Sequence, residues 1–346
     1  MATFWFVLVG LLLTVYVVLD GFDLGVGTLH LLVAKSERER ATCIRSIGPV
    51  WDGNEVWLIA GGGTLFFAFP VLYARAFSGF YLPLIMVLWL LTGRALAIEL
   101  RHQVDSPLWR QAWDVAFAGC SAALAFFFGV ALGNIVRGVP LGKDGTFFEP
   151  LFTDFQLGDR TGILDWYTIL VGLAAVTALA HHGALWLAFK VDGEVQTRAR
   201  ALARKLWFAT VGTTLAMTAA TMIAQPRLAE NLQAHFAGAL LPLTCVGGLG
   251  ASFFFARKQR YRAAFFASAA YLAALMGSAA FAVYPYVLPA RDARFGLHID
   301  AAASPSATLA GALWWWIPAL LLTIGYFVFV YTRLPAVFSV DDEADH

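Results

Sequence analysis

Residues 263–290 read AAFFASAAYLAALMGSAAFAVYPYVLPA and contain no Asp, Glu, Lys or Arg. A helix that crosses the hydrocarbon core of a membrane needs about 20 predominantly apolar residues, and this segment is longer than that. Three further stretches also lack these charged residues: 76–93, 115–136 and 236–256. The sequence therefore predicts an all-α integral membrane protein rather than a water-soluble domain.

The composition of the whole chain agrees with a membrane location. Of the 346 residues, 60% are hydrophobic and 14% are charged, whereas about 25% of the residues in an average soluble domain are charged. The formal net charge of +1 gives no sign that the chain binds nucleic acid or another polyanion. Three cysteines, with no Cys-x-x-Cys pair among them, indicate neither a disulfide framework nor a zinc site.

Nine segments are long and apolar enough to span a membrane. The first apolar run continues into Asp20 without a cleavage-site pattern, so we expect a retained first span. The nine predicted spans are residues 4–33, 55–75, 77–100, 113–136, 164–189, 206–225, 236–256, 263–287 and 309–332. The longest predicted connections, 137–163 and 190–205, are short for independent domains.

We therefore expect one polytopic membrane domain, 1–346. Four spans precede the longest connection and four follow it, which suggests a first four-helix bundle at 4–136 and a second at 164–287. The last span, 309–332, would be one extra peripheral helix.

The basic residues predict the orientation of the chain. The connections and span ends on one side hold 17 of the 24 Lys and Arg residues, and those on the other side hold 7. Because cytoplasmic loops carry an excess of Lys and Arg, the N-terminus should face the periplasm and the C-terminus the cytoplasm.

Five acidic residues fall toward the cytoplasmic ends of the first three predicted spans. Asp20 and Asp23 lie three positions apart on one face of the first helix, and Asp52 and Glu55 repeat this spacing where the second span begins. Glu99 lies at the end of the third span. Charged groups inside a membrane are costly unless they are paired or hydrated, so this cluster suggests the mouth of a proton-uptake path.

A structural interpretation of the same acids stays open. Asp52 could be the N-cap of the second helix, with Glu55 as its capping-box partner. The two acids of the first span could simply pair with Arg94 or Arg101.

Glycines in the first two spans point to close helix packing. Gly21 and Gly25 form a Gly-x-x-x-Gly pair, and Gly61, Gly62 and Gly63 are consecutive. Because small residues let membrane helices approach closely, we expect this face to pack against a second membrane protein.

The seven histidines do not suggest a haem site. His181 and His182 are the ones that lie well within a span, and adjacent helical residues point about 100° apart, so they cannot both face one iron. No His-x-x-x-His or Cys-x-x-Cys-His pattern occurs. We expect this chain to bind no haem and no metal.

Several motifs resemble subunit II of cytochrome bd-type quinol oxidases, including the cyanide-insensitive branch. They are Leu-Asp-Gly-Phe-Asp-Leu-Gly-Val-Gly at 19–27, Trp-Asp-Gly-Asn-Glu-Val-Trp at 51–57, Ala-Phe-Ser-Gly-Phe-Tyr at 76–81 and Phe-Gly-Val-Ala-Leu-Gly-Asn at 128–134. Gly-Val-Pro at 138–140 and Tyr-Pro at 284–285 continue the pattern. The likeness covers essentially the whole chain.

The resemblance implies an oxidase subunit that is not catalytic alone. It would pair with a homologous subunit I, which carries three haems, two b-type and one d-type or b-type replacement, and the quinol-oxidising loop. The complex oxidises quinol, reduces dioxygen to water and generates a proton gradient across the bacterial inner membrane. Subunit II supports the haem subunit, contributes to proton supply and, in some members, guides oxygen or holds a structural quinone. Membrane lipids and a small single-helix accessory subunit are further candidate partners.

The resemblance also assigns roles by position. Asp52 and Glu99 match acidic positions of the family's proton route, and Asp23 matches the second aspartate of the first-span motif. Trp57 matches the aromatic residue near a proposed oxygen entrance. Where the family route can include a lysine about one turn beyond the third-span acid, this chain has Gln103, which leaves the outermost proton donor open.

Two other functions compete with the oxidase subunit. A proton-coupled secondary transporter would also contain intramembrane acids and glycines, but it should show corresponding broken helices in two halves of the chain. Here the acidic, glycine-rich segments crowd into the first three spans. A scaffold within the same oxidase, with the acids as simple helix caps, is the third interpretation.

Overall fold

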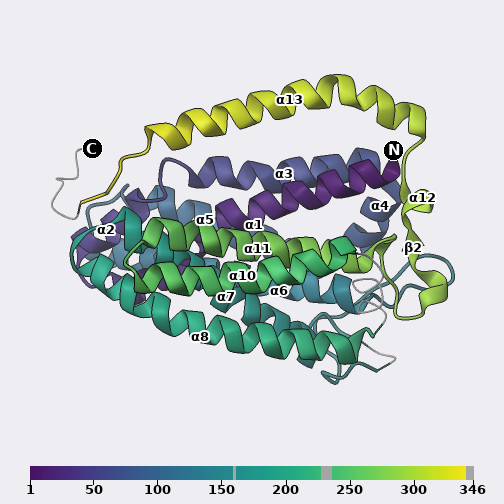
Figure 1. Ribbon diagram of the computed structural model, residues 1–346, viewed down its shortest axis with the longest axis horizontal. Helices are drawn as coiled ribbons and strands as arrows, with labels where there is room; N and C mark the ends of the chain where they lie inside the picture. Colours follow the sequence, from purple (N-terminus) through teal and green to yellow (C-terminus); the bar gives the residue numbers. More distant parts are fainter. Residues whose placement is uncertain (159–160, 227–235, 340–346) are drawn as a thin grey trace.

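The computed structural model describes residues 1–158, 161–226 and 236–339, which form long helices lying roughly side by side (Figure 1). In these residues, eight single helices are long and apolar enough to cross a membrane, and a bent pair adds a ninth candidate. The eight helices are α1 (Ala2–Val33), α5 (Tyr81–Leu100), α6 (Pro107–Arg137), α7 (Trp166–Lys190), α8 (Gly193–Ala224), α10 (Phe236–Arg257), α11 (Tyr261–Val283) and α13 (Ser306–Arg333). The predicted all-α membrane fold is therefore confirmed.

The second predicted span, 55–75, is not one straight helix. Its residues belong to α3 (Trp51–Ala68) and α4 (Pro70–Gly79), and the chain bends by 118° between these two helices. Pro70 has no N–H to donate, and the residue before a proline avoids helical geometry. Phe69 accordingly has φ −133° and ψ 62°, so the straight part of this span ends earlier than predicted.

Ser304 closes the broken end of α3. Its backbone N–H donates to the carbonyl oxygen of Ala68 at 2.9 Å, and its hydroxyl donates to that of Phe67 at 2.6 Å. Ser304 follows the short helix α12 (Ile299–Ala302) in the connection between α11 and α13. A distant part of the chain therefore satisfies carbonyl groups at a helix end, where intrahelical partners are missing.

The connections contain more structure than the sequence suggested. The stretch 190–205, predicted to be a loop, is mostly helical because α8 begins at Gly193, well before its apolar part. The short helix α2 (Glu37–Arg45) begins with a capping box formed by Ser36 and Glu39. The connection between α11 and α13 also contains β1 (Tyr286–Leu288), η1 (Ala293–Phe295) and β2 (Leu297–His298), and the two strands pair antiparallel.

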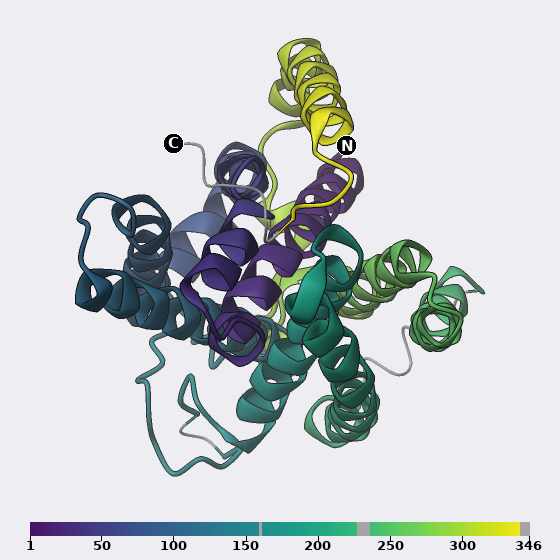
Figure 2. The same ribbon diagram turned by 90° about the vertical axis from the view of Figure 1, so that its left-hand side faces the viewer.

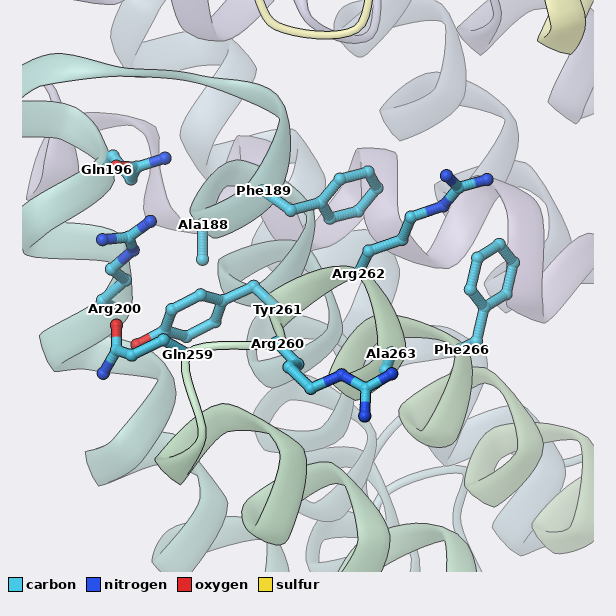
Figure 3. A pocket seen from close by; sticks show the side chains of 10 residues that line it. All are labelled: Ala188, Phe189, Gln196, Arg200, Gln259, Arg260, Tyr261, Arg262, Ala263 and Phe266. Atoms are coloured by element: carbon cyan, nitrogen blue, oxygen red, sulfur yellow. The ribbon is translucent and has the colours of Figure 1, made fainter.

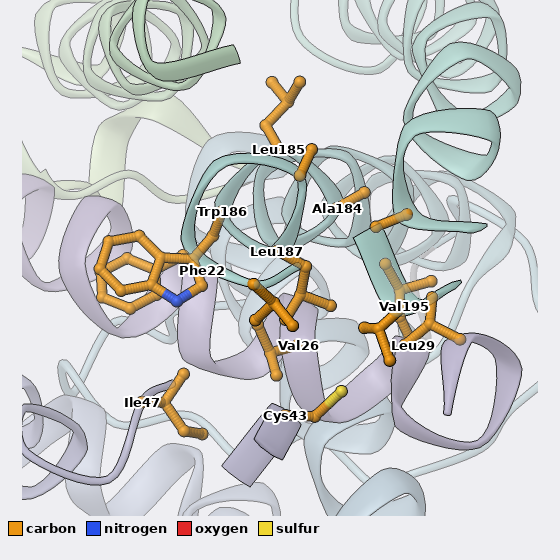
Figure 4. Close-up of a cluster of buried hydrophobic side chains, with 14 of the residues drawn as sticks. Phe22, Val26, Leu29, Cys43, Ile47, Ala184, Leu185, Trp186, Leu187 and Val195 are labelled. Carbon is orange, nitrogen blue, oxygen red and sulfur yellow. The ribbon is translucent and has the colours of Figure 1, made fainter. Parts of the chain in front are cut away.

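Helix α1 packs against α3, α6, α7 and α11 and so joins the two halves of the chain. Its contact with α7 is close because Gly25 faces Gly183, and a Cβ on Gly25 would lie 2.1 Å from the carbonyl oxygen of Leu179. Nearby, the ring of Phe22 stacks on that of Trp186 with 4.0 Å between centroids, inside a buried apolar cluster (Figure 4). The main core therefore lies between α1 and α7.

Helix α13 stands apart from the other helices for much of its length (Figures 1 and 2). Aromatic pairs connect it to its neighbours: Trp316 lies 5.8 Å from Trp5, and Phe327 lies 5.2 Å from Trp57, measured between ring centroids. Its other side is apolar and open, with Trp314 86% exposed. This exposed apolar surface is typical of a helix that contacts lipid or another membrane protein.

Candidate functional site

The five acids of the predicted proton path belong to α1, α3 and α5, and they lie toward the end of the molecule that faces the viewer in Figure 2. We call this end the basic end, because most of the Lys and Arg residues of the chain lie there. It comprises the connections 34–50, 101–106, 191–192, 258–260 and 334–339 with the adjoining helix ends. Arg94 of α5 reaches into its interior, where its Nη2 donates to Asp20 Oδ1 of α1 at 2.7 Å and also to Glu55 of α3. One buried guanidinium therefore ties three helices together.

Asp23 belongs to a second set of contacts, in which its partners are uncharged side chains. Asn54 Nδ2 donates to Asp23 Oδ2 at 2.7 Å, and the hydroxyl of Tyr331 on α13 donates to Asn54 Oδ1 at 2.9 Å. Asp23 and Asn54 are fully buried. Neither Asn54 nor Tyr331 was a predicted site residue, although Asn54 lies inside the motif at 51–57.

The outer acids, Asp52 and Glu99, lie outside this buried network. Both are exposed, Asp52 in the first turn of α3 and Glu99 at the last turn of α5. The capping interpretation is wrong, because Val50 is the N-cap of α3 and no side chain caps this helix. Glu55 instead forms an ion pair with Arg94. Asp20 pairs with the same arginine, so the alternative that the acids of the first span pair with an arginine is correct for Asp20.

A further buried ion cluster surrounds Asp114 of α6. His30 Nε2 lies 2.8 Å from Asp114 Oδ1, and Arg101 Nε donates to the same oxygen at 2.7 Å. Arg101 also donates to Glu37 of α2 at 2.8 Å, so it does not pair with the acids of α1. This cluster was not predicted, although Asp114 is a single acid inside an apolar span and so was a signal for it.

The glycines predicted to contact a partner mostly pack within the chain. A Cβ on Gly21 would lie 2.9 Å from Leu179 of α7, and one on Gly61 would lie 3.1 Å from Leu13 of α1. With Gly25 also in contact with α7, that prediction is wrong for these three glycines. Gly62 and Gly63 have open space around the position of a Cβ.

Trp57 is buried on the wall of an apolar groove of about 1020 Å³ between α13 and the rest of the bundle. We call it the α13 groove. Its walls include Leu12, Phe265, Leu320 and Phe327. Trp57 is thus an interior side chain next to an apolar space.

The two adjacent histidines of α7 have other partners than a metal. His181 interacts with the carbonyl oxygen of Ala203 at 3.1 Å, and His182 interacts with Ser268 Oγ at 2.6 Å. Among the residues that the structure describes, no three His, Cys, Asp or Glu side chains are grouped to hold a metal ion. Both imidazoles are therefore hydrogen-bonded to groups of this chain.

Arg137 organises the opposite end of the molecule. Its guanidinium is bound by Glu149 and Asp165, and all three side chains are buried. Burial raises the pKa of Glu149, although the charge of Arg137 opposes this shift. Asp165 is also the N-cap of α7, so the cluster fixes the 138–165 connection to two helices. This cluster was not predicted, although an acid directly before an apolar run is a helix-start signal.

The fold and the charge network define a multi-pass α-helical membrane protein with paired and hydrogen-bonded acids buried in its spans. The family model for cytochrome bd terminal oxidase subunit II matches residues 1–334, and the chain belongs to this family. It is accordingly a multi-pass protein of the bacterial inner membrane.

Curated relatives agree with this assignment. The chain is 40% identical over 200 residues to the probable cytochrome oxidase subunit 2 of Haemophilus influenzae, and 39% identical over 200 residues to the cytochrome bd-I ubiquinol oxidase subunit 2 of Escherichia coli K12. Each match covers 58% of this chain and 52% of the relative, so the chain spans about half the length of these relatives.

The bd oxidase of Geobacillus thermodenitrificans shares the fold. The two structures superpose with a TM-score of 0.77 over 95% of this chain and 97% of that chain, at 18% sequence identity.

Proposed function

We propose that this chain is the second subunit of a cytochrome bd-type quinol oxidase and supports a haem-bearing first subunit. The family match over residues 1–334 and the shared fold support this proposal. The complex would transfer electrons from quinol to dioxygen, form water, and take the protons for that reaction from the cytoplasm. The haems would reside in the partner, and the two sets of four helices in this chain, 4–136 and 164–287, would form two bundles that hold it.

The observation that carries the proton-supply role is the gathering of acids from α1, α3 and α5 at the basic end. Asp20, Asp23 and Glu55 are held by buried polar partners, whereas Asp52 and Glu99 are exposed on the same helices. A charge that faces lipid in mid-membrane costs about 2.5–3.5 kcal/mol, so exposed acids belong near water or a polar partner. We infer that Asp52 and Glu99 deliver protons where the two subunits meet.

The basic end is the cytoplasmic end in this proposal. It carries 17 of the 24 Lys and Arg residues, as expected for a cytoplasmic surface. The N-terminus would then face the periplasm, and the acids would lie on the side from which the protons are taken.

The α13 groove supports a role for Trp57 beside an oxygen path. Dioxygen is apolar and partitions into apolar space, and the groove of about 1020 Å³ passes Trp57.

The test is purification of the tagged chain from its native membrane in mild detergent. We expect a second, larger membrane protein to co-purify, and a reduced-minus-oxidised spectrum to show haem that is lost when that protein is removed. The proposal would be rejected if the intact chain purified without a haem-bearing partner, or if the haem stayed with this chain alone.

The transporter alternative gains no support from the comparisons. The matching family and relatives are all described as oxidase subunits.

A further inference from the structure

Two adjoining cavities lie at the basic end. The first, which we call the arginine cup, has a volume of about 580 Å³ and is lined by Arg200, Arg260 and Arg262 (Figure 3). The second is the α13 groove. Phe189, Arg262 and Phe266 line both cavities, so the arginine cup and the apolar groove adjoin at these three side chains.

The cup carries an excess of positive charge. Neither cavity has a carboxylate in its lining, and Lys190 adds a cation on the groove side. Within the described part of the chain, no ion pair joins Arg200, Arg260 or Arg262 to an acid. Arg200 instead lies over the ring of Tyr261, with its guanidinium carbon 4.7 Å from the centroid. Such a group of uncompensated cations attracts an anion.

The groove has the length and chemistry for a hydrocarbon chain. Along α1 its wall runs from Leu8 to Phe22, which is roughly 21 Å at about 1.5 Å per helical residue. One leaflet of the hydrocarbon core is about 15 Å thick. Opposite α1, the wall is formed by Leu320, Ile324 and Val328 of α13. An extended acyl chain could therefore lie in the groove over the depth of a leaflet.

Arg262 marks the border between the two environments. Figure 3 shows its side chain extending between the rings of Phe189 and Phe266, whereas Arg200 lies on the far side of Tyr261. Lys190 donates from its ammonium group to the carbonyl oxygen of Pro335 at 2.6 Å, which holds the end of the groove together. Cations thus lie where a phospholipid headgroup would meet its acyl chains.

We propose that the arginine cup and the α13 groove together bind one anionic phospholipid. Its phosphodiester lies among the arginines, and an acyl chain lies along α1 and α13. Basic pockets between membrane helices on the cytoplasmic side bind anionic headgroups in this way. A free phosphate would leave the groove empty, and a zwitterionic lipid would have no need of three arginines.

The experiment compares lipids retained by the purified complex after prolonged detergent washing. The variant Arg200→Gln with Arg262→Gln removes two cup cations, and Arg262→Gln alone is a milder change at an exposed side chain. The matched control is Lys258→Gln with Arg333→Gln, which removes two cations at the same end from residues that line neither cavity. Lipids are identified by mass spectrometry, so the readout does not depend on oxidase activity.

We expect the wild type and the control to retain a stoichiometric amount of phosphatidylglycerol or another anionic phospholipid. The double variant should bind added phosphatidylglycerol about 30-fold more weakly, which corresponds to about 2 kcal/mol for two cations near an anionic surface. Phosphatidylcholine should not replace it. Equal retention by the double variant, retention of a quinone or a zwitterionic lipid instead, or displacement by excess inorganic phosphate would each overturn the proposal.

Discussion

Arg94 Nη2 lies 2.7 Å from Asp20 Oδ1, and at most 1% of either side chain is exposed. Removing one partner of a buried pair leaves an uncompensated charge and costs about 3–5 kcal/mol, whereas replacing both partners with uncharged groups is much milder. The pair connects α5 to α1, and Glu55 connects the same guanidinium to α3. The ion pairs of Arg94 therefore help to hold α1, α3 and α5 in their observed arrangement.

Arg94→Gln should destabilise the complex by about 3–5 kcal/mol and sharply reduce its recovery from membranes, because Asp20 then remains buried without its cation. Adding Asp20→Asn should restore part of that recovery. Thermal denaturation of the purified complex, followed by intrinsic fluorescence, provides the measurement. Additive losses in the double variant would show that the two residues do not act as a pair.

Asp52→Asn should give a complex with full haem content that oxidises quinol at least roughly tenfold more slowly, since a proton-transfer group is lost. The deficit should grow at high pH, where protons are scarce. The matched control is Asp105→Asn, which removes an exposed acid from the same end of the chain outside the α1, α3 and α5 group. Normal turnover of the haem-replete Asp52→Asn enzyme across pH would exclude Asp52 as an essential relay.

Gly25→Ala should lower the stability of the chain itself, because the new Cβ would lie 2.1 Å from the Leu179 carbonyl oxygen and 2.8 Å from the Gly183 Cα. Overpacking of this kind costs about 1–3 kcal/mol or more. Gly62→Ala has open space and should leave the chain unchanged. Recovery of each variant as a monodisperse peak in detergent distinguishes them, and equal recovery would contradict the α1–α7 contact.

Glu39 should stabilise the basic end in a pH-dependent manner. Its hydrogen bond from Arg198 is the main reason that its pKa falls from 4.5 to about 2. A carboxyl group with a lowered pKa in the folded state contributes stability that is complete above pH 4.5 and lost as the pH falls toward 2.

Glu39→Gln should therefore lower the free energy of unfolding by only about 1 kcal/mol at pH 7, because the ion pair is partly exposed. The difference from the wild type should narrow below pH 4.5, where the wild-type carboxyl group also loses its charge. Glu194→Gln is the control, because Glu194 lies 4.0 Å from the same arginine on an exposed surface. Unfolding midpoints in detergent at several pH values provide the comparison. A deficit that stayed constant down to pH 3 would point to packing rather than charge.

The positions of the membrane spans could be predicted because the bilayer imposes a local requirement on the chain, a run of about 20 apolar residues. That requirement ends at the membrane surface. Hydropathy gave no reason to extend the sixth span back to Gly193, because the first part of α8 carries Arg198, Arg200, Arg204 and Lys205. The helix breaks at Pro70 because the residue before a proline avoids helical geometry. The apolar residues continue across this point, so hydropathy alone predicted one span.

The sequence predicted which acidic residues form the site, but it did not predict which side chain each of them contacts. The cost of a lone charge in a membrane indicated that Asp20 needs a partner, yet the rotation of α1 decides that Asp20 meets Arg94 while Asp23 meets Asn54. The contact between His30 and Asp114 depends on which helices are neighbours, and no local pattern encodes that. The same limit explains why Gly25 was assigned to an outer surface.

The two hydrogen bonds from Ser304 to the end of α3 affect the order of biogenesis. Phe67 enters the membrane long before Ser304 exists, because 237 positions separate them. At about 5–20 residues per second, a ribosome needs roughly 12 to 47 s to synthesise that interval. During this time the carbonyl groups at the bend must be satisfied by water or by the insertion machinery. A nascent chain that stops before α12 would therefore keep an incomplete bend and offer quality-control proteases a site that the finished protein has closed.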